Sequence, residues 1–182
     1  GEIYGKQVDL YGTDGEISYK PFDLLKIVYE NGTEEIPEWK TSEKYGFLTD
    51  DEYVIIDFKN SDYYKTAEEY YNRMTINKSM EGIVIKPEII RKGKAPYLKV
   101  RNPEYLSIIY GYDYMFPHKY EKLIKQKNIR KKLKASINEY ELGQDLLKIP
   151  FSKINNDNAE FRQIAANLLF EVSQEKDIDP RL

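Results

Sequence analysis

The sequence predicts an α+β fold in which a region of short strands precedes a helical region. β-Branched runs such as Tyr-Val-Ile-Ile and Ile-Val-Ile lie in the first hundred residues. In the last eighty residues, apolar side chains recur at helical spacing, as Ile129, Leu133 and Ile137 do. We therefore expect two domains, with sheet predominating in 1–102 and helices in 103–182.

Short apolar runs bounded by turn-forming residues predict five strands in the first domain. The pair Asn31-Gly32 is a turn signal, so the second strand should continue into a hairpin. Pro87 ends the fourth strand and holds Lys86 extended. The strands are expected at Gly1–Val8, Pro21–Tyr29, Glu52–Phe58, Gly82–Lys86 and Tyr97–Arg101.

The first domain should also contain one helix. Ser61 or Asp62 can cap it, and it should run to about Asn77. One face of this helix is predicted to be buried, and it carries Tyr64, Ala67, Tyr71 and Met74.

The second domain reads as a series of helices. Asn102 followed by Pro103 is a helix-start signal, because asparagine caps well and proline suits the first helical position. Further helices are expected at Lys119–Gln126 and at 128–148, and Asp157 can cap a last one. The inward residues of that last helix should be Phe161, Ile164, Ala165, Leu168 and Val172.

The composition excludes several kinds of site. The 182 residues include no cysteine, which excludes disulfides, thiolate zinc sites and cysteine nucleophiles. The single histidine, His118, follows a proline, and we interpret it as a surface residue rather than a catalytic base. No apolar run approaches the ~20 residues that a membrane span needs. No signal-type leader is visible, so we expect a cytoplasmic protein.

The net charge of −3 hides a strong asymmetry along the chain. Residues 1–77 hold 8 Lys/Arg and 17 Asp/Glu, residues 78–134 hold 15 and 5, and residues 135–182 hold 5 and 9. A basic block inside an acidic protein fits a polyanionic partner such as nucleic acid. A solvated, lysine-rich helix face fits equally well, and charge alone does not decide between the two.

The strongest chemical pattern is a carboxylate at the start of one strand followed by two cations on the next. Glu81 opens the run Glu-Gly-Ile-Val-Ile-Lys, and Lys99 and Arg101 follow in Leu-Lys-Val-Arg. Residues two apart in a strand face the same side, so both cations should share a face. A carboxylate can hold Mg²⁺ while cations neutralise phosphate oxygens. The alternative is an ordinary hairpin with solvated ends.

These runs resemble conserved motifs of the covalent nucleotidyltransferases, which include DNA ligases, RNA ligases and capping enzymes. Glu81–Lys86 resembles motif IV, and Leu98–Arg101 resembles motif V. Upstream, Pro21–Leu25 resembles motif IIIa, and Gly1–Gly5 resembles motif III of RNA ligases. Four motifs in the family's order imply that residues 1–102 form part of a nucleotidyltransferase domain with a mixed or antiparallel sheet.

Three further segments narrow the resemblance. The segments are Arg101–Gly111, Tyr140–Gly143 and Asp179–Leu182. All three are similar to the ligase component of bacterial polynucleotide kinase-phosphatase RNA-repair proteins. This resemblance implies a C-terminal helical module at 103–182. It also implies RNA as a partner, together with an RNA-repair kinase/phosphatase module and an RNA 3′-terminal methyltransferase.

The resemblance implies a role for each site residue and two cofactors, ATP and Mg²⁺ or Mn²⁺. Glu2 would bond the ribose, or be an exposed N-terminal charge, and Phe22 would stack on adenine, or be a core residue. Val84 would form the other wall of the adenine pocket, and Glu81 would bind the metal. The residues that would contact phosphates are Lys86, Lys99 and Arg101.

The family's chemistry also needs a nucleophilic lysine in a Lys-x-x-Gly motif I, upstream of motif III. None of the lysines in this sequence occupies that position. We expect a truncated or partly omitted chain, and the alternatives are a second polypeptide that supplies motif I or a pseudoenzyme.

The predicted function is therefore part of an ATP-dependent RNA-repair ligase. It would seal 5′-phosphate and 3′-OH ends through lysyl-AMP and RNA-adenylate intermediates. The alternatives are a non-catalytic RNA-binding or scaffolding module, and another nucleotidyltransferase such as a DNA ligase.

Overall fold

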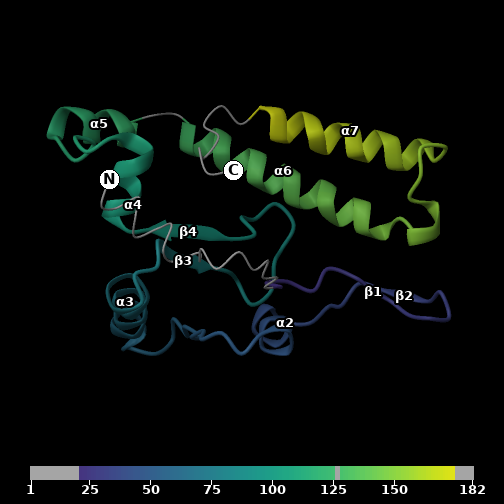
Figure 1. Ribbon diagram of the computed structural model, residues 1–182, viewed down its shortest axis with the longest axis horizontal. Helices are drawn as coiled ribbons and strands as arrows, with labels where there is room; N and C mark the ends of the chain where they lie inside the picture. Colours follow the sequence, from purple (N-terminus) through teal and green to yellow (C-terminus); the bar gives the residue numbers. More distant parts are fainter. Residues whose placement is uncertain (1–20, 126–127, 175–182) are drawn as a thin grey trace, which may run out of the picture. The chain divides into compact units, whose positions relative to one another are not determined.

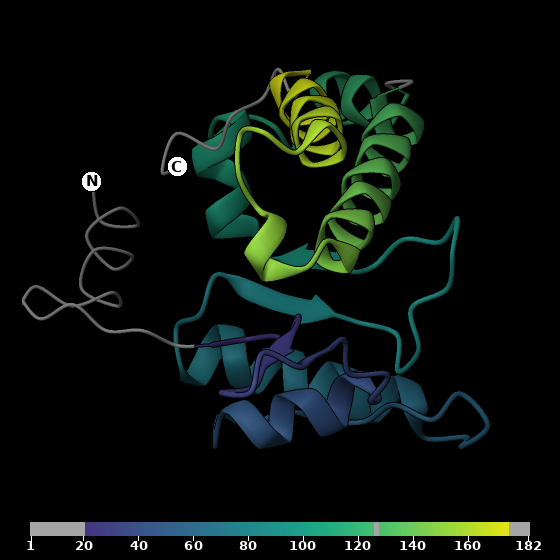
Figure 2. The same cartoon turned by 90° about the vertical axis from the view of Figure 1, so that its right-hand side faces the viewer.

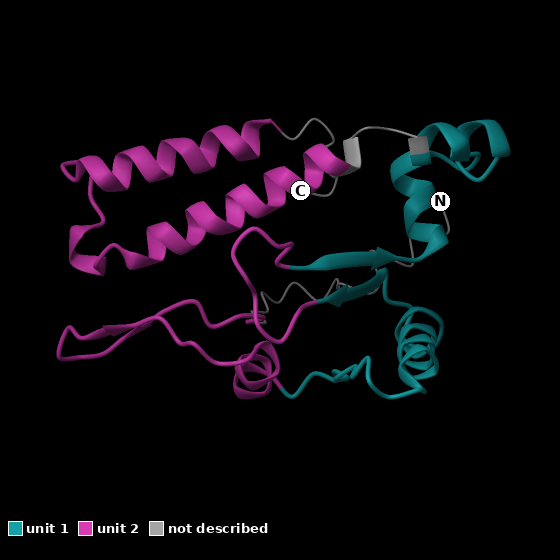
Figure 3. Ribbon diagram, turned by 180° about the vertical axis from the view of Figure 1, so that it is seen from behind, with its two compact units in different colours: residues 1–20, 50–85, 97–125 teal, residues 21–49, 86–96, 126–182 magenta. Residues whose placement is uncertain are grey.

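The computed structural model describes residues 21–125 and 128–174, and these confirm the α+β class (Figure 1). Helices alternate with two small sheets, each a pair of antiparallel strands. The described chain divides into two compact units, which Figure 3 distinguishes by colour. Unit 1 comprises residues 50–85 and 97–125, and unit 2 comprises residues 21–49, 86–96 and 128–174. The predicted domain boundary after residue 102 stays a prediction.

The sheet of unit 1 is the hairpin expected from the sequence. Strand β3, Gly82–Ile85, pairs antiparallel with β4, Leu98–Arg101. Each strand is one residue shorter than predicted. The strand predicted at Glu52–Phe58 is wrong, because this segment has no partner strand within the described residues and stays irregular. Its burial still alternates after Tyr53, because Val54 and Ile56 are half-buried while Tyr53 and Ile55 are exposed.

The helix predicted to end near Asn77 is present as two joined pieces. Helix α3, Tyr63–Asn72, continues as the π-helical turn η1, Arg73–Asn77. Asp62 stands at the N-cap but makes no capping side-chain hydrogen bond. Tyr64, predicted to be buried, is exposed instead, while Ala67, Tyr71 and Met74 are half-buried.

Two further helices lie in the described part of unit 1, and its buried tyrosines lie in the first of them and in the turn between the two. Helix α4, Pro103–Tyr110, begins as predicted, with the side chain of Asn102 accepting from the Tyr105 backbone N–H at 2.7 Å. Helix α5 spans Pro117–Lys125. Tyr105 is 1% exposed and Tyr114 is 6% exposed, and burial raises the pKa of Tyr114 above its ordinary value.

Unit 2 begins with a hairpin that is shorter than expected. Strand β1, Ile27–Val28, pairs with β2, Glu34–Glu35, and Gly32 supplies the left-handed residue of the turn at φ +81°. The buried strand predicted at Pro21–Tyr29 is therefore wrong for residues 21–26. These residues have no strand partner among those described, and Phe22 and Leu25 lie exposed.

Helix α2, Thr41–Leu48, was not expected from the sequence because it lacks a one-sided apolar stripe. Local polar contacts favour its start. The Glu43 carboxylate accepts from the Lys40 backbone N–H at 2.8 Å.

Two long helices complete unit 2, and both views show them side by side (Figures 1 and 2). Helix α6, Asn128–Lys148, has the predicted bounds. The 3-10 turn η2, Phe151–Lys153, leads to α7, Ala159–Ser173. Asn158, rather than the predicted Asp157, caps α7, because its side chain accepts from two backbone N–H groups of the first turn. Of the predicted inward residues, only Val172 is exposed.

Few large apolar side chains are buried in the described ranges. The large apolar residues that are buried in these ranges are Tyr105, Tyr114 and Ile149. Both faces of the β3–β4 pair carry exposed apolar residues. None of the described helices combines the length and the apolar character that crossing a membrane requires. The described units therefore depend on a core and also on groups of hydrogen bonds and ion pairs between segments. Each such group is called a polar joint below.

One polar joint lies in unit 1 and is built on Asn102. Besides capping α4, its side chain donates to the carbonyl oxygen of Met80 at 3.0 Å. Its backbone N–H donates to the carbonyl oxygen of Glu81 at 2.8 Å. Asn102 thus joins the start of β3, the end of β4 and the start of α4.

A second polar joint lies in unit 2. The amine of Lys26 forms an ion pair with Glu34 and donates to the carbonyl oxygen of Ile149 at 2.8 Å. Glu34 in turn accepts from the Phe151 backbone N–H at 2.7 Å. The hydrogen bond from Lys26, then that from the Phe151 N–H, lowers the pKa of Glu34 below its ordinary value of 4.5.

We expect Asn102→Ala to destabilise the protein by about 2 kcal/mol. The change removes one helix cap, worth about 1 kcal/mol, and leaves the carbonyl of the half-buried Met80 without this donor at a similar cost. Urea unfolding followed by circular dichroism measures this loss. Asn72→Ala, at an exposed position, is the matched control and should change stability little. Equal midpoints for the two variants would contradict the role of Asn102.

Acid should weaken the Lys26–Glu34 joint. A carboxyl whose pKa is lowered on folding stabilises the protein above its unfolded pKa, near 4.5, and loses that contribution as the pH falls through its folded pKa. Between pH 7 and pH 3, the urea midpoint of Glu34→Gln should therefore fall less than that of the unaltered protein. Parallel pH profiles for the two proteins would show that Glu34 does not carry this effect.

Candidate nucleotide-binding site

The β3–β4 register places the predicted site residues of unit 1 on one face of the hairpin. Val84 pairs with Lys99, and Gly82 pairs with Arg101. Directly opposed residues of antiparallel strands share a face, as do residues two apart in one strand. Val84, Lys99 and Arg101 therefore lie on the same side, which confirms the expectation that both cations share a face. Ile83 and its neighbours in register occupy the other side.

Glu81 stands just outside the strand and forms an ion pair with Arg101. Strand β3 begins at Gly82. The direction of the Glu81 side chain is therefore not set by the alternation of side chains along the strand. The Glu81 and Arg101 side chains are 16% and 19% exposed, which makes this a largely desolvated pair. A pair of this kind holds both side chains in a defined orientation.

Arg101 is further oriented by aromatic neighbours. Its guanidinium carbon lies 4.6 Å from the centroid of the buried Tyr105 ring, within cation–π range. The hydroxyl of Tyr71 donates to the Arg101 carbonyl oxygen at 3.4 Å. Helices α3 and α4 thus both contribute to holding the end of β4.

Lys99 differs from Arg101 in being exposed. Its amine lies 5.8 Å from the centroid of the Tyr97 ring, at the start of the same segment. An exposed, flexible ammonium beside a fixed guanidinium suits a phosphate that must enter and leave.

Gly82 is a site residue that the sequence reasoning did not single out. A Cβ built at this position would lie 2.1 Å from the Val100 carbonyl oxygen and 2.8 Å from the Arg101 Cα. Any side chain would therefore push β4 away at the point where Arg101 meets Glu81. A glycine inside a strand often marks such a close approach, and that signal was present in the sequence.

Phe22 and Lys86 lie together in unit 2. The Lys86 Nζ donates to the Phe22 carbonyl oxygen at 3.2 Å and lies 5.3 Å from the centroid of the Phe22 ring. Phe22 is 71% exposed, which leaves its ring accessible to a stacking partner. Glu2 falls outside the described residues.

A divalent metal is implied by the family resemblance, and the donor chemistry of Glu81 fits one. Mg²⁺ in phosphate sites is typically held by one or two carboxylates, with substrate oxygens and water completing its shell. The described residues contain no group of three or more His, Cys, Asp or Glu that would form an all-protein cage. Glu81 beside two cations is thus suited to a metal shared with a nucleotide phosphate.

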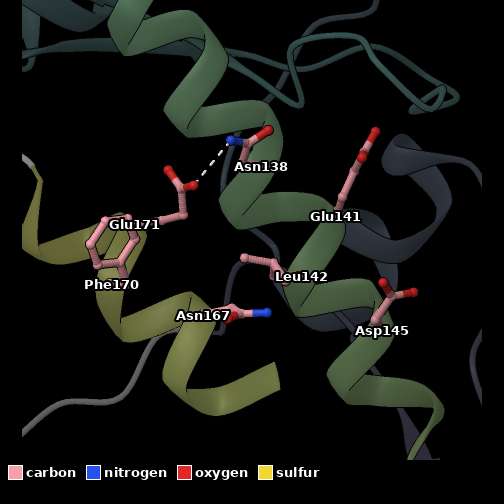
Figure 4. A pocket seen from close by; sticks show the side chains of 7 residues that line it. All are labelled: Asn138, Glu141, Leu142, Asp145, Asn167, Phe170 and Glu171. Atoms are coloured by element: carbon pink, nitrogen blue, oxygen red, sulfur yellow. Dashed lines mark hydrogen bonds between the residues drawn. The ribbon is translucent and has the colours of Figure 1, made fainter. Parts of the chain in front are cut away.

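A cavity of about 340 Å³ lies between α6 and α7 (Figure 4). Asn138 donates to Glu171 across it at 3.1 Å. The lining includes three carboxylates but neither lysine nor arginine, so its charge opposes a nucleotide phosphate. The lining residues are Asn138, Glu141, Leu142, Asp145, Asn167, Phe170 and Glu171. None of the predicted site residues is among them.

Comparisons with known proteins relate this chain to a family of ligase domains. The family described as PNKP adenylyltransferase domain, ligase domain, matches residues 28–157. Two solved structures, of the Pnkp1/Rnl/Hen1 complex and the Pnkp1/Rnl/Hen1 RNA repair complex, each contain a chain that this one matches over 100% of its length. Both show 29% sequence identity, with TM-scores of 0.79 and 0.76. This chain covers 46% of each of those chains, so it spans less than half of their length. The comparison with curated proteins finds no match.

The family match spans both strands of the hairpin that carries Glu81, Lys99 and Arg101. It begins after Phe22, so the segment resembling motif IIIa lies just before it. The predicted relationship to the ligase component of polynucleotide kinase-phosphatase RNA-repair proteins is confirmed: the chain belongs to the family of PNKP adenylyltransferase ligase domains.

Proposed function

We propose that this chain contributes nucleotide- and metal-binding residues to an ATP-dependent RNA-repair ligase. The observation that carries the proposal is the face of the β3–β4 hairpin, where Val84, Lys99 and Arg101 lie together beside Glu81. An apolar residue, two cations and a carboxylate provide what the base, the phosphates and the metal of a nucleotide each need. Membership of an adenylyltransferase family supports ATP as that nucleotide.

The reaction we propose for the complete protein has three steps. A lysine amine attacks the α-phosphorus of ATP, forming a P–N bond while pyrophosphate leaves. The AMP then passes to the 5′-phosphate of an RNA end, and the lysine amine is released. Finally the 3′-OH of a second end attacks that 5′-phosphate, and AMP leaves as the phosphodiester forms. None of the lysines in this chain takes the first role in the proposal.

Each residue of the hairpin has a physical part in this chemistry. Lys99 and Arg101 would hold the phosphate oxygens on which charge develops, which stabilises the transition state. Glu81 would hold a Mg²⁺ or Mn²⁺ ion, and that ion would supply further charge neutralisation at the phosphate when bound. The ion pair with Arg101 orients the Glu81 carboxylate before nucleotide arrives.

The adenosine would be held by residues from other segments. Phe22 would stack on adenine with its exposed ring. From the family resemblance, Val84 would also contact the base. Glu2 would accept a hydrogen bond from the ribose. Phosphate contacts dominate the charge balance, while these residues give selectivity for the nucleoside.

The solved structures support a proposal about partners. They are complexes of Pnkp1 with Rnl and Hen1, described as an RNA repair complex. We propose that this chain acts in a comparable assembly, with RNA as substrate. A kinase/phosphatase module and an RNA 3′-terminal methyltransferase would be its companions. We further propose that residues 1–102 form part of the nucleotidyltransferase domain and that residues 103–182 form a C-terminal helical module.

Labelling with α-labelled ATP tests the proposal. In the full-length protein, Glu81→Ala and Lys99→Ala should each lower lysyl-AMP formation about a hundredfold, since a charge-positioning side chain contributes roughly 3 kcal/mol. Lys94→Ala, at an exposed loop position, is the control and should label normally. The isolated 182-residue chain should not label. Covalent AMP on any of its lysines, or a full-length protein that never labels, would overturn the proposal.

RNA binding should depend on the exposed basic residues near the start of α6. Arg130, Lys131 and Lys134 are exposed there, in a sequence segment, 119–134, that holds eight basic residues and one acid. Contacts to phosphate release counterions, so affinity should fall steeply with salt. Changing these three residues to serine should reduce the slope of log K against log salt by up to about three, with little change in sequence preference.

A charge-matched triple variant controls for net charge. It changes three exposed lysines elsewhere, namely Lys59, Lys92 and Lys153. This control should leave the salt slope nearly unaltered. If the α6 variant and the control bind RNA alike at low salt, the basic residues of α6 form a solvated face rather than an RNA contact.

A further inference from the structure

The amine of Lys86 is engaged by the segment that carries Phe22. It donates to the Phe22 carbonyl oxygen and lies near the face of the ring, at the distances given above. It also lies 3.6 Å from the Asp23 Oδ2. The Lys86 and Asp23 side chains are 21% and 29% exposed, so water screens this pair only partly. An ammonium has three donor hydrogens, and the charge and hydrogen-bonding capacity of this one are directed toward residues 22 and 23.

The segment that carries Phe22 needs external support to hold the ring. Residues 21–26 have no regular secondary structure, and the Phe22 ring is largely exposed. A ring in such a segment can take several rotamers, and ordering it on binding costs free energy. Contacts that fix the ring beforehand therefore increase affinity for whatever stacks on it.

The backbone around Lys86 is itself anchored. The Thr41 hydroxyl, at the start of α2, donates to the Pro87 carbonyl oxygen at 2.6 Å, and its backbone N–H donates to the Glu88 carbonyl oxygen at 3.0 Å. The Ser42 hydroxyl donates to the Glu88 carboxylate at 2.9 Å. Lys86 precedes a proline, which restricts its backbone to an extended conformation. The lysine therefore reaches Phe22 from a fixed base.

Helix α6 supports the loop after Lys86 through the motif Tyr140–Gly143, to which the proposed function gives no role. Burial raises the pKa of Tyr140, and the nearby negative charge of Asp23 raises that pKa further. Glu141 accepts from the Gly93 backbone N–H at 2.8 Å, in the stretch that follows Lys86. Through Glu141, the motif thus contacts the loop that continues from Lys86.

We propose that Lys86 is a positioning residue that acts on adenine through Phe22, rather than through the phosphates. Its amine fixes the backbone and ring of Phe22, with Asp23 balancing its charge. This inference rests on the proposed function, because it takes stacking of adenine on Phe22 as its premise. Lys86 then contributes to recognition of the base, and Lys99 and Arg101 to recognition of the phosphates.

Binding of ATP and of tripolyphosphate to the full-length protein separates these roles. Lys86→Met keeps most of the aliphatic side chain but removes the charge. It should weaken ATP binding about five- to tenfold, the size expected for one cation–π contact and one hydrogen bond. Tripolyphosphate, which has no base, should bind unaltered. Lys86→Arg should restore ATP binding, since a guanidinium can make both contacts.

A double-variant cycle tests whether Lys86 acts through Phe22. In a Phe22→Ala background, Lys86→Met should cause no further loss of ATP affinity. Asp23→Asn is an independent variant that should weaken ATP in the same direction and spare tripolyphosphate. Lys153→Met, at an exposed position, should change neither ligand, and Lys99→Met should weaken both.

The outcomes distinguish this inference from its premise. Suppose Lys86→Met weakens tripolyphosphate as much as ATP, or adds fully to Phe22→Ala. Lys86 then contacts phosphate directly and the positioning role is overturned, while the proposed function stands. If the unaltered full-length protein neither binds ATP nor becomes labelled, the proposed function is overturned first and this inference falls with it.

Discussion

Three of the hydrogen bonds of Asn102, those made by its side chain and its backbone N–H, are the constraint on which unit 1 depends. With one side chain and one N–H, this residue fixes the start of β3, the end of β4 and the first turn of α4. A two-stranded sheet is marginal in water, so its geometry must be set by what its ends are attached to. Arg101 precedes Asn102 directly, and its pairing with Glu81 therefore follows from this attachment rather than from the strands alone.

Close backbone approach and charge pairing act together at the same point. Gly82 lets β4 come within reach because a Cβ there would collide with Val100. Glu81 can then meet Arg101 in a partly desolvated setting, where the attraction between opposite charges is stronger than in water. The order glutamate then glycine thus has a physical reason. The glutamate supplies the charge that pairs with Arg101, and the glycine, having no Cβ, allows β4 to approach closely enough for this pair to form.

The sequence predicts best where a pattern is local and strong. The bounds of α6, the Asn102 cap and the shared face of Lys99 and Arg101 follow from periodicity and capping chemistry, and all three are confirmed. The strands predicted over 21–26 and at Glu52–Phe58 are wrong, because a strand needs a partner that local pattern cannot reveal. The association of Lys86 with Phe22 joins residues 64 positions apart, and only the fold brings them together. The roles assigned to the site residues remain predictions.

The discontinuity of both units has a consequence for the nascent chain. Unit 2 takes segments from 21–49, 86–96 and the stretch after residue 126, so its first segment is made long before α6. At synthesis rates of about 5–20 residues per second, that first segment waits on the order of ten seconds for its long helical partner. Phe22 and Phe47 are exposed even in the folded unit. They are therefore accessible to chaperones throughout that interval as well. Folding of unit 2 on the ribosome is thus governed by the completion of its C-terminal helices.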